Sequence, residues 1–356
     1  MGAVAYATVE QVKDAPDWSG LARSDNVIYQ KLLTSSRSIE NSLLGGRRFY
    51  PETRTIRLDW PTHQYNPTWR LPLDESNYII SVDSLTSGGD AITNYFLRRW
   101  DDREEPPYQF IEVDRSSNDV FQAGTTAQRS IVLTGLFGET DTATDTIAAA
   151  CSGSLSSSAT TGAFTAINNT LTVGVGSLLL IEDERLLVTG LRYADTTVNT
   201  TATIAATPAD TAVGVTDGTV FAIGEVILLD AEKLLVEDIA GNTLVVRRAV
   251  EGTTLAGHSS DADVFAKRTM VLSRGELGST AATHADTTEI YVHEFPSLIN
   301  ELAIAETTVA LAQSASSYAR SIGLSGNARE TVGKGLEDLR YRVQCAYGGT
   351  ARATAV

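Results

Sequence analysis

Two stretches in the middle of the chain repeat one another, and this repeat limits the possible folds more than any other feature of the sequence. The stretch "GSLLLIEDERLLV" from Gly176 aligns without gaps with "GEVILLDAEKLLV" from Gly224, at an offset of 48 residues and with six of thirteen positions identical. A repeat of this kind is a small unit that buries its apolar face against a neighbouring copy. The sequence therefore predicts duplicated β-hairpins that share a buried face.

A second alignment, at an offset of 26 residues, pairs the stretch that starts at Leu244 with the stretch that starts at Met270. The two histidines that it matches are expected to hold a turn, because a histidine outside any metal-ligand spacing is usually an ordinary side chain. The matched residues are Arg248, Gly252, Thr254, Ala256 and His258 in the first stretch and Arg274, Gly278, Thr280, Ala282 and His284 in the second.

Short runs rich in β-branched and aromatic residues fill the chain from about residue 52 to about residue 292, and Gly, Pro, Asp and Asn separate them, which is typical of strands and turns. Helical periodicity occurs only near the two ends. Thr8 and Gln11 have capping-box spacing, and Gly45 and Gly46 supply the left-handed stop of a helix. We therefore expect an α+β fold: a small helical core from both chain ends, with a large inserted all-β region containing internal hairpin repeats.

The same signals divide the chain into five parts. The stretch "CSGSLSSSATTG" at 151 to 162 is rich in Ser and Thr, and this composition favours a linker ahead of the repeats. The expected parts are residues 1–50 and 291–349 for the helical core, 51–140 for a proximal β domain, 141–290 for the repeat-containing β insertion, and 350–356 for a flexible tail.

The charge of the chain excludes one class of function. It carries 44 acidic and 28 basic residues, for a formal charge of −16, whereas a protein that grips DNA needs clustered Lys and Arg to neutralise phosphates. Neither a signal peptide nor a bilayer-spanning apolar run is visible in the sequence. We expect a soluble protein, made in a cytoplasm, that does not bind a membrane.

No set of residues in the sequence has the spacing of a catalytic or metal site. Cys151 and Cys345 lie far apart, and the four histidines have no ligand partner at helical or hairpin spacing. Glu184 and Glu232 match in the repeat, but a hydrolase would need its carboxylates to converge on a cleft. We expect no enzyme activity, no cofactor and no metal.

The order of elements along the chain resembles that of the head-to-tail adaptor (connector) proteins of long-tailed bacteriophages. The segment "NVIYQKLLTSSRSIENSLLGGRRFY" is similar to the first helix of that family, "SLINELAIAETTVALAQSASSYA" to its long helix, and "VGKGLEDLRYRV" to the loop and start of its last helix. The β stretches "SGGDAITNYFLRRW" and "FQAGTTAQRSIVLTGLFG" are similar to the β portion of larger adaptors. The repeat insertion departs from the small helical members of the family.

The resemblance implies a structural protein of the virion neck, made in the cytoplasm of the host bacterium. Subunits of such adaptors form a ring, expected to be a dodecamer, that joins the capsid to the tail beneath the portal protein. A head–tail stopper or tail terminator protein would bind the other side of the ring. Genomic DNA would pass through the lumen without sequence-specific binding, and an acidic lumen would repel its phosphates.

Two groups of residues are candidate contact sites. Arg47 and Arg48 follow a helix stop and can reach carbonyl groups at a helix C-terminus, while the aromatic pair beside them is expected to be buried at a hinge. We expect these arginines to join the helices to the β domain and to pair with carboxylates of a neighbouring subunit. The interface residues are Arg47, Arg48, Phe49, Tyr50 and Arg54.

The C-terminal tail is the second candidate. In the adaptors that this chain resembles, the tail reaches toward the portal, and seven small or polar residues with one charge cannot build a core of their own. The expected portal-binding residues are Thr350, Ala351, Arg352, Ala353, Thr354, Ala355 and Val356.

Two other readings of the sequence remain open. Another phage structural protein, such as a tail or decoration protein with β-rich carbohydrate-binding modules, would present exposed aromatic residues. A hydrolase would present convergent polar residues. The adaptor reading explains why helices from both ends flank the β region, although a β-rich insertion by itself identifies no function.

Overall fold

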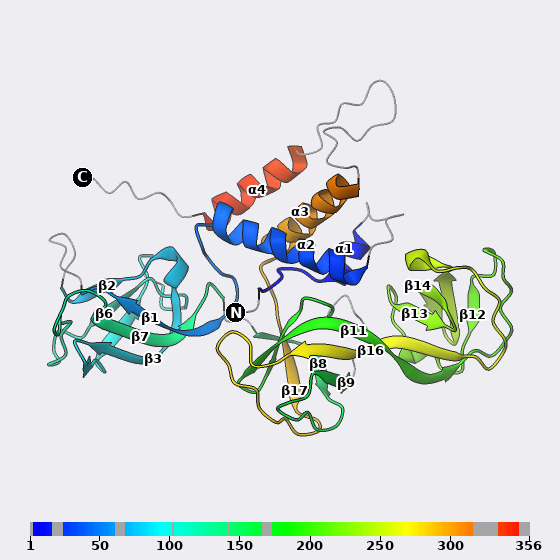
Figure 1. The fold of residues 1–356 in the computed structure, drawn as a ribbon, viewed down its shortest axis with the longest axis horizontal. Helices are drawn as coiled ribbons and strands as arrows, with labels where there is room; N and C mark the ends of the chain where they lie inside the picture. Colours follow the sequence, from blue (N-terminus) through cyan, green and yellow to red (C-terminus); the bar gives the residue numbers. More distant parts are fainter. Residues whose placement is uncertain are drawn as a thin grey trace.

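The structure is a computed structural model, and it describes residues 3–15, 24–60, 68–101, 103–140, 143–165, 173–315 and 334–348. Three β units lie in a row, and helices from both ends of the chain lie together along one side of the row (Figure 1). No helix in these ranges has the length and apolar character needed to cross a membrane.

The helices come from the two ends of the chain. Thr8 and Gln11 form the expected capping box, because each side chain bonds the backbone N–H of the other at 3.1 and 2.9 Å. Gly45 and Gly46 adopt φ of 63° and 93°, which ends the second helix as expected. The helices are α1 (Val9–Asp14), α2 (Asp25–Ser38, continued by a π-helical turn at Ile39–Leu43), α3 (Ser297–Ala315) and α4 (Lys334–Tyr347).

The proximal β domain packs two antiparallel sheets against each other. One has the strand order β1-β7-β3-β4 and the other β2-β6-β5, and their inner faces share a core that includes Ile79, Ile111 and Leu133. The strands are β1 (Glu52–Leu58), β2 (Arg70–Pro72), β3 (Ile79–Ser87), β4 (Asp90–Ala91), β5 (Tyr95–Arg98), β6 (Phe110–Val113) and β7 (Ile131–Phe137).

The second β unit, the central barrel, is closed. Its strands follow the order β11-β10-β17-β8-β9-β16, and an additional pairing of β11 with β16 joins the first strand to the last. Closure removes exposed sheet edges. These strands are β8 (Ala143–Cys151), β9 (Thr161–Thr165), β10 (Leu178–Ile181), β11 (Glu184–Asn199), β16 (Asp263–Ser273) and β17 (Glu289–His293).

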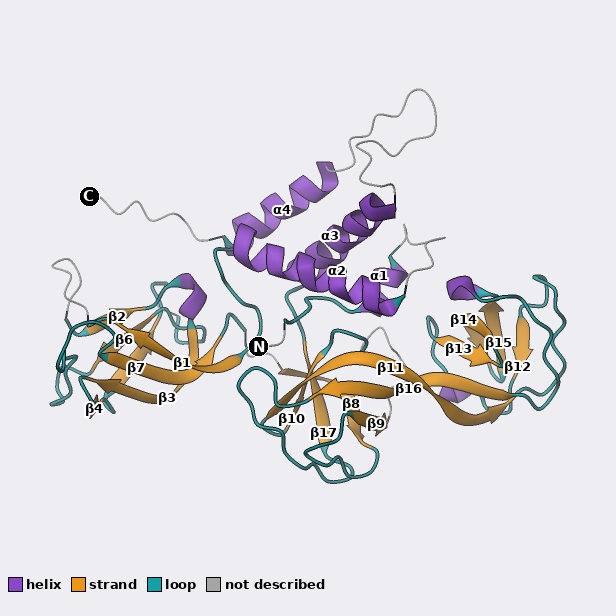
Figure 2. Cartoon of the chain, in the orientation of Figure 1, coloured by secondary structure: helices purple, strands orange, loops and turns teal. Residues whose placement is uncertain are grey.

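The third unit, the distal barrel, grows from the far ends of the same two long strands. From β16 the sheet continues through β13, β14, β15 and β12, and a bridge between Thr200 and Val215 returns it to the end of β11. Figure 2 shows β11 and β16 as a twisted ribbon between the two barrels. The added strands are β12 (Ala212–Gly214), β13 (Val226–Leu229), β14 (Glu232–Ala240) and β15 (Thr243–Arg247).

The two barrels are copies of one unit, and one copy is inserted into the other. Strands β10 and the start of β11 correspond to β13 and β14 at the offset of 48, whereas the end of β16 and β17 correspond to β15 and the start of β16 at the offset of 26 in the other direction. The register agrees: Leu179 pairs with Val292 in the central barrel, and Ile227 pairs with Ala266 in the distal barrel. Two offsets arise because the distal copy lies between the halves of the central copy.

The expected α+β class with its own helical core is wrong, because the chain is mostly β. Seventeen strands and four α-helices occur in the described residues, and the helices do not enclose a separate core. Their apolar cluster also contains side chains of the central barrel, namely Val175, Leu178, Leu187 and Leu277. The helices form a layer on the β units, since a short amphipathic helix is stable only when its apolar face is packed.

The Ser/Thr-rich stretch at 151 to 162 is not a linker. Cys151 ends β8, Leu155 is 5% exposed within the core of the central barrel, and Thr161 begins β9. The small residues between them form a turn in the barrel wall, where Leu155 pairs with His284. The composition indicated a flexible segment, but backbone pairing with a distant part of the chain, as between Leu155 and His284, holds it in place.

Candidate functional site

The interface arginines predicted from the sequence lie where the helical layer meets the proximal β domain. Arg47 follows the glycine stop, and its Nη1 donates a hydrogen bond to the backbone carbonyl of Tyr347 at 2.6 Å, at the C-terminal end of α4. The same guanidinium lies 3.4 Å from Glu75 and 3.6 Å from Glu139 of the β domain. Arg47 thus connects the last helix to the first β unit.

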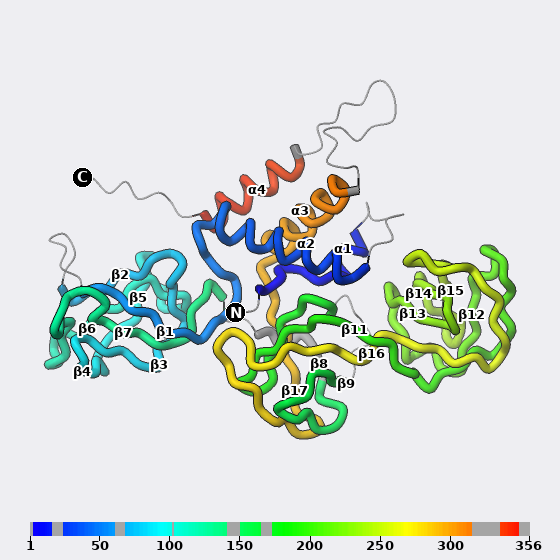
Figure 3. Tube along the Cα trace, in the orientation of Figure 1, coloured from blue at the N-terminus to red at the C-terminus, as the bar shows by residue number. Residues whose placement is uncertain are grey.

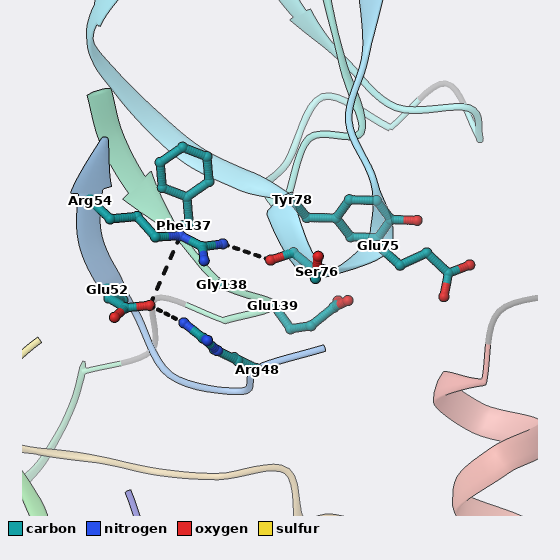
Figure 4. Close-up of a pocket in the computed structure, with 9 residues that line it drawn as sticks. All are labelled: Arg48, Glu52, Arg54, Glu75, Ser76, Tyr78, Phe137, Gly138 and Glu139. Atoms are coloured by element: carbon teal, nitrogen blue, oxygen red, sulfur yellow. Dashed lines mark hydrogen bonds and ion pairs between the residues drawn. The ribbon is translucent and has the colours of Figure 1, made fainter. Parts of the chain in front are cut away.

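Arg48 and Arg54 extend this group around a small pocket (Figure 4). Arg48 forms an ion pair with Glu52. Arg54 donates from Nη2 to the carbonyl of Ser76 at 2.6 Å, and its guanidinium lies over the ring of Phe137 at 4.8 Å. We call Arg47, Arg48, Arg54 and their carboxylates Glu52, Glu75 and Glu139 the arginine junction. The pocket is lined by the junction residues other than Arg47 and by Ser76, Tyr78, Phe137 and Gly138.

The aromatic pair after the arginines is buried, with Phe49 1% and Tyr50 6% exposed. Phe49 packs edge-on against Tyr6 at 6.0 Å and Tyr347 at 5.0 Å, so residues from both chain ends meet on its ring. Its carbonyl accepts a hydrogen bond from Nε2 of His293 at 2.7 Å. The structure therefore brings all five predicted interface residues to one boundary inside the chain.

The carboxylates that pair with these arginines belong to the same chain. Glu52 is 3% exposed, and burial raises the pKa of Glu139 while Arg47 and Arg99 oppose the change. Arginine stays protonated at any physiological pH, so the junction offers fixed charge and hydrogen bonds rather than proton transfer. The predicted tail, Thr350 to Val356, lies outside the described residues.

A second polar site, which the sequence did not predict as a site, lies in the central barrel. The carboxylate of Glu184 is 1% exposed and receives a bidentate pair from Arg274, Nε to Oε1 and Nη2 to Oε2, both at 2.7 Å. The backbone N–H groups of Gly275 and Ala282 donate at 3.0 and 2.9 Å. Nε2 of His284 lies 2.8 Å from Oε2 of Glu184, so one carboxylate has five hydrogen-bond contacts with four residues.

The distal barrel repeats this arrangement with equivalent residues. Glu232 is fully buried and is paired with Arg248 at 2.8 and 2.7 Å, while Nε2 of His258 lies 2.9 Å from Oε2 of Glu232. The other ring nitrogen faces an exposed acid in both barrels: Nδ1 of His284 lies 2.8 Å from Glu182, and Nδ1 of His258 lies 2.8 Å from Asp230.

These two networks join loops that are far apart in the chain. Burial alone would raise the pKa of Glu184, but the hydrogen bonds from Arg274, Ala282 and His284 outweigh it and hold the pKa at about 2. In the same way, burial is outweighed by Arg248 and His258, and the pKa of Glu232 is also about 2. Both carboxylates remain ionised at neutral pH and hold together residues that are distant in the sequence.

The repeat alignments matched the buried glutamate, the arginine and the histidine of the two networks, yet they did not indicate that these residues meet. The glutamates belong to the offset of 48, whereas the arginines and histidines belong to the offset of 26, and Glu184 and Arg274 are 90 residues apart. The sequence signal for these sites was that the glutamates match at one offset while the arginines and histidines match at the other. Within the described ranges, no group of three or more His, Cys, Asp or Glu side chains is arranged to hold a metal ion.

Comparison with known proteins does not place the chain in a family. No family model matches it, no curated protein matches it, and no solved structure matches it.

Proposed function

We propose that this protein is a structural component of a bacteriophage neck, a head-to-tail adaptor whose copies form a ring beneath the portal. The observation that carries the proposal is that both ends of the chain build one helical layer beside the β units, as Figure 3 shows by colour. The segments that carry the resemblance to adaptors include α2, α3 and α4, and the helix pairs α2–α3 and α3–α4 are in contact.

The proposed partners are the portal, a stopper or tail terminator protein, and further copies of the chain. The formal charge of −16 supports a passage in which DNA slides, because an acidic lumen repels phosphate groups. In the described residues all three arginines of the junction already form ion pairs with carboxylates of the same chain. This pairing supports a role in joining parts of the protein rather than in gripping DNA.

The test combines the purified protein with the portal of the same virus. Electron microscopy of the mixture should show a closed ring of this protein on one end of the portal, and native mass spectrometry should give one defined stoichiometry. A variant with Arg47→Lys and Arg48→Lys keeps the charge but loses bidentate geometry, and it should assemble poorly. Absence of any association with the portal would contradict the proposal, as would normal assembly by the lysine variant combined with loss of packaged DNA when glutamine replaces both arginines.

One observation favours the alternative, a tail or decoration protein with a carbohydrate-binding module. Phe96 and Trp100 in the proximal domain are each 46% exposed, and Trp100 stacks on Phe110 at 4.4 Å. Exposed aromatic rings can stack on sugars. Binding of the purified protein to host glycans that is lost in Trp100→Ala, without association with the portal, would support this alternative.

A further inference from the structure

The two barrels have equivalent cores, so their surfaces can be compared position by position. The core of the central barrel contains Val173, Leu179, Leu186 and Met270, and the residues at the repeat offsets, Phe221, Ile227, Leu234 and Leu244, are all in the core of the distal barrel. A residue on the surface of one barrel therefore has a defined counterpart on the other.

The turn before the first repeated strand has the same backbone in both copies. Gly176 donates its N–H to the carbonyl of Val188 at 2.8 Å, and Gly224 donates to Val236 at 2.8 Å. Both glycines have positive φ, 109° and 87°. The residue just before each glycine, Val175 or Ile223, consequently occupies the same place on its barrel.

In the central barrel this place is covered. Val175 is 2% exposed and belongs to the apolar cluster of the helical layer. Its carbonyl accepts from the N–H of Val9 at 2.9 Å, and its N–H donates to Oε2 of Glu10 at 2.8 Å. The apolar segment Val4 to Ala7, which includes the buried ring of Tyr6, leads into the first turn of α1 and is buried in the same cluster.

In the distal barrel the same place is open. Ile223 is 57% exposed, and its N–H and carbonyl have no hydrogen-bond partner among the described residues. Val226 and Leu235, a cross-strand pair, are half-buried, whereas their counterparts Leu178 and Leu187 are 1% and 3% exposed. Among the residues that the structure describes, the distal barrel thus keeps an apolar face without the cover that its twin has.

We propose that Ile223, Val226 and Leu235, the distal docking face, bind a segment of a partner protein in which apolar residues lead into the first turn of a helix. The chemistry of the partner follows from the cover on the twin: apolar residues, then a backbone N–H for the carbonyl of Ile223 and a carboxylate for its N–H, as Val9 and Glu10 supply them to Val175. Such a segment would hydrogen-bond the backbone groups of Ile223 and remove apolar surface from water. This proposal does not depend on the adaptor function.

The probe is a fluorescent peptide with the sequence of residues 3–13 of this chain, "AVAYATVEQVK", added to the full-length protein and followed by fluorescence anisotropy. We expect saturable binding that is weakened at least tenfold by Ile223→Asp. The matched control is Val120→Asp, because Val120 is an equally exposed aliphatic side chain, at 62%, in the proximal domain. A peptide with Glu10→Ala should also bind more weakly, since it lacks the carboxylate.

Three outcomes would overturn the proposal: no binding to the unmodified protein, equal binding to the Ile223→Asp variant, or equal loss in both variants. Binding that survives Ile223→Asp would place the peptide on the central barrel, in exchange for the N-terminal segment already there. Hydrogen exchange of the free monomer gives an independent readout. A protected Ile223 amide would show that the chain itself fills the distal docking face, and this too would reject the proposal.

Discussion

At the scale of single residues, the two buried glutamates need several compensating interactions. Glu184 and Glu232 lose nearly all contact with water, and a buried carboxylate is tolerated only when paired and hydrogen-bonded. Each receives a bidentate arginine, two backbone N–H groups and a histidine. Arginine suits this position because its planar fork matches the two carboxylate oxygens.

Removing one of these charges should destabilise the barrel that contains it. Glu232→Gln keeps the shape but leaves the Arg248 guanidinium buried without its counter-ion, and loss of one partner of a buried pair costs about 3–5 kcal/mol of unfolding free energy. Urea denaturation measures the change. Glu237→Gln is the control, because Glu237 forms an exposed pair with Arg247 at 3.3 Å, and such pairs contribute about 0–1 kcal/mol. Similar losses in both variants would contradict this account.

The same carboxylates predict how stability depends on acid. Their pKa is about 2 in the folded protein against an ordinary value of 4.5, so the stability that they contribute is fully present above pH 4.5 and is lost as the pH falls toward 2. Urea midpoints measured from pH 5 to pH 2.5 should fall steeply. A Glu184→Gln, Glu232→Gln double variant should have a lower urea midpoint at pH 5 and a smaller decrease of the midpoint toward pH 2.5. If the midpoint decreases as steeply as in the unmodified protein, other groups control acid unfolding.

Arg47 should matter for the attachment of the last helix. Its guanidinium bonds the carbonyl of Tyr347 and lies over the Tyr78 ring at 5.3 Å, and lysine cannot make both contacts with one planar group. Arg47→Lys should cost about 1–2 kcal/mol and increase hydrogen exchange in α4. Arg57→Lys is the matched control, because Arg57 is an exposed residue of β1, and it should change neither the stability nor the hydrogen exchange of α4. Unchanged hydrogen exchange in α4 would show that the apolar contacts of this helix are enough to hold it in place.

At the scale of elements, the same loop of the two barrels makes two different contacts with the rest of the chain. In the central barrel, Leu277 is buried in the helical-layer cluster, and its carbonyl accepts from Thr53 at 2.9 Å. In the distal barrel the equivalent residue is Glu251, which pairs with Lys13 of α1. Lys267 adds a second ion pair, to Asp25 at 3.2 Å. One contact is apolar and the other depends on charge.

The charged contact should be sensitive to salt, because partly exposed ion pairs are screened. Lys13→Ala, or about 0.5 M NaCl, should increase the mean distance between α1 and the distal barrel, measured by electron spin resonance between labels on the two elements. Lys233→Ala is the control, since Lys233 pairs with Glu251 at 2.7 Å within the distal barrel. Equal effects of the two lysine variants would mean that Lys13 does not hold the barrel in place.

At the scale of the whole molecule, the nested duplication explains how the distal copy can interrupt the central barrel without disturbing its core. In the part of the chain that the structure describes, the distal copy joins the central barrel through β11 and β16, and its apolar core is a separate cluster. The central barrel, in contrast, shares a cluster with the helices. Removing all of residues 141–290 would therefore uncover the helical layer, whereas removing the distal copy alone should not.

The structure defines the shortest connection for that removal. Arg192 pairs with Thr269 across the ribbon, as Ala240 pairs with Thr243 at the Gly241–Asn242 turn of the distal copy. Replacing residues 193–268 by Gly-Asn should close the central barrel with the turn of its twin. We expect a folded monomer with one cooperative unfolding transition. A protein that aggregates or shows no near-ultraviolet circular dichroism would contradict the autonomy of the two units.

The sequence alone determined the local features of this protein. The capping box at Thr8, the glycine stop at Gly45, the β character of the middle region and both repeats depend on residues close together in the chain, where backbone preference and periodicity act. Burial of Phe49 and Tyr50 could also be predicted, because an aromatic pair directly after a helix stop has a nearby core to enter.

The tertiary structure determined how the two repeat copies combine and which β unit the helices pack against. Two alignments with different offsets are compatible with hairpins in a row or with one copy inside the other, and only the pairing of β11 with β16 selects the second. The fold class also depended on tertiary contacts. The helical layer is joined to the central barrel by Val175, Leu178, Leu187 and Leu277. Contacts of this kind depend on the register of strands far apart in the chain, and local sequence patterns carry no information about which distant strand will be the partner.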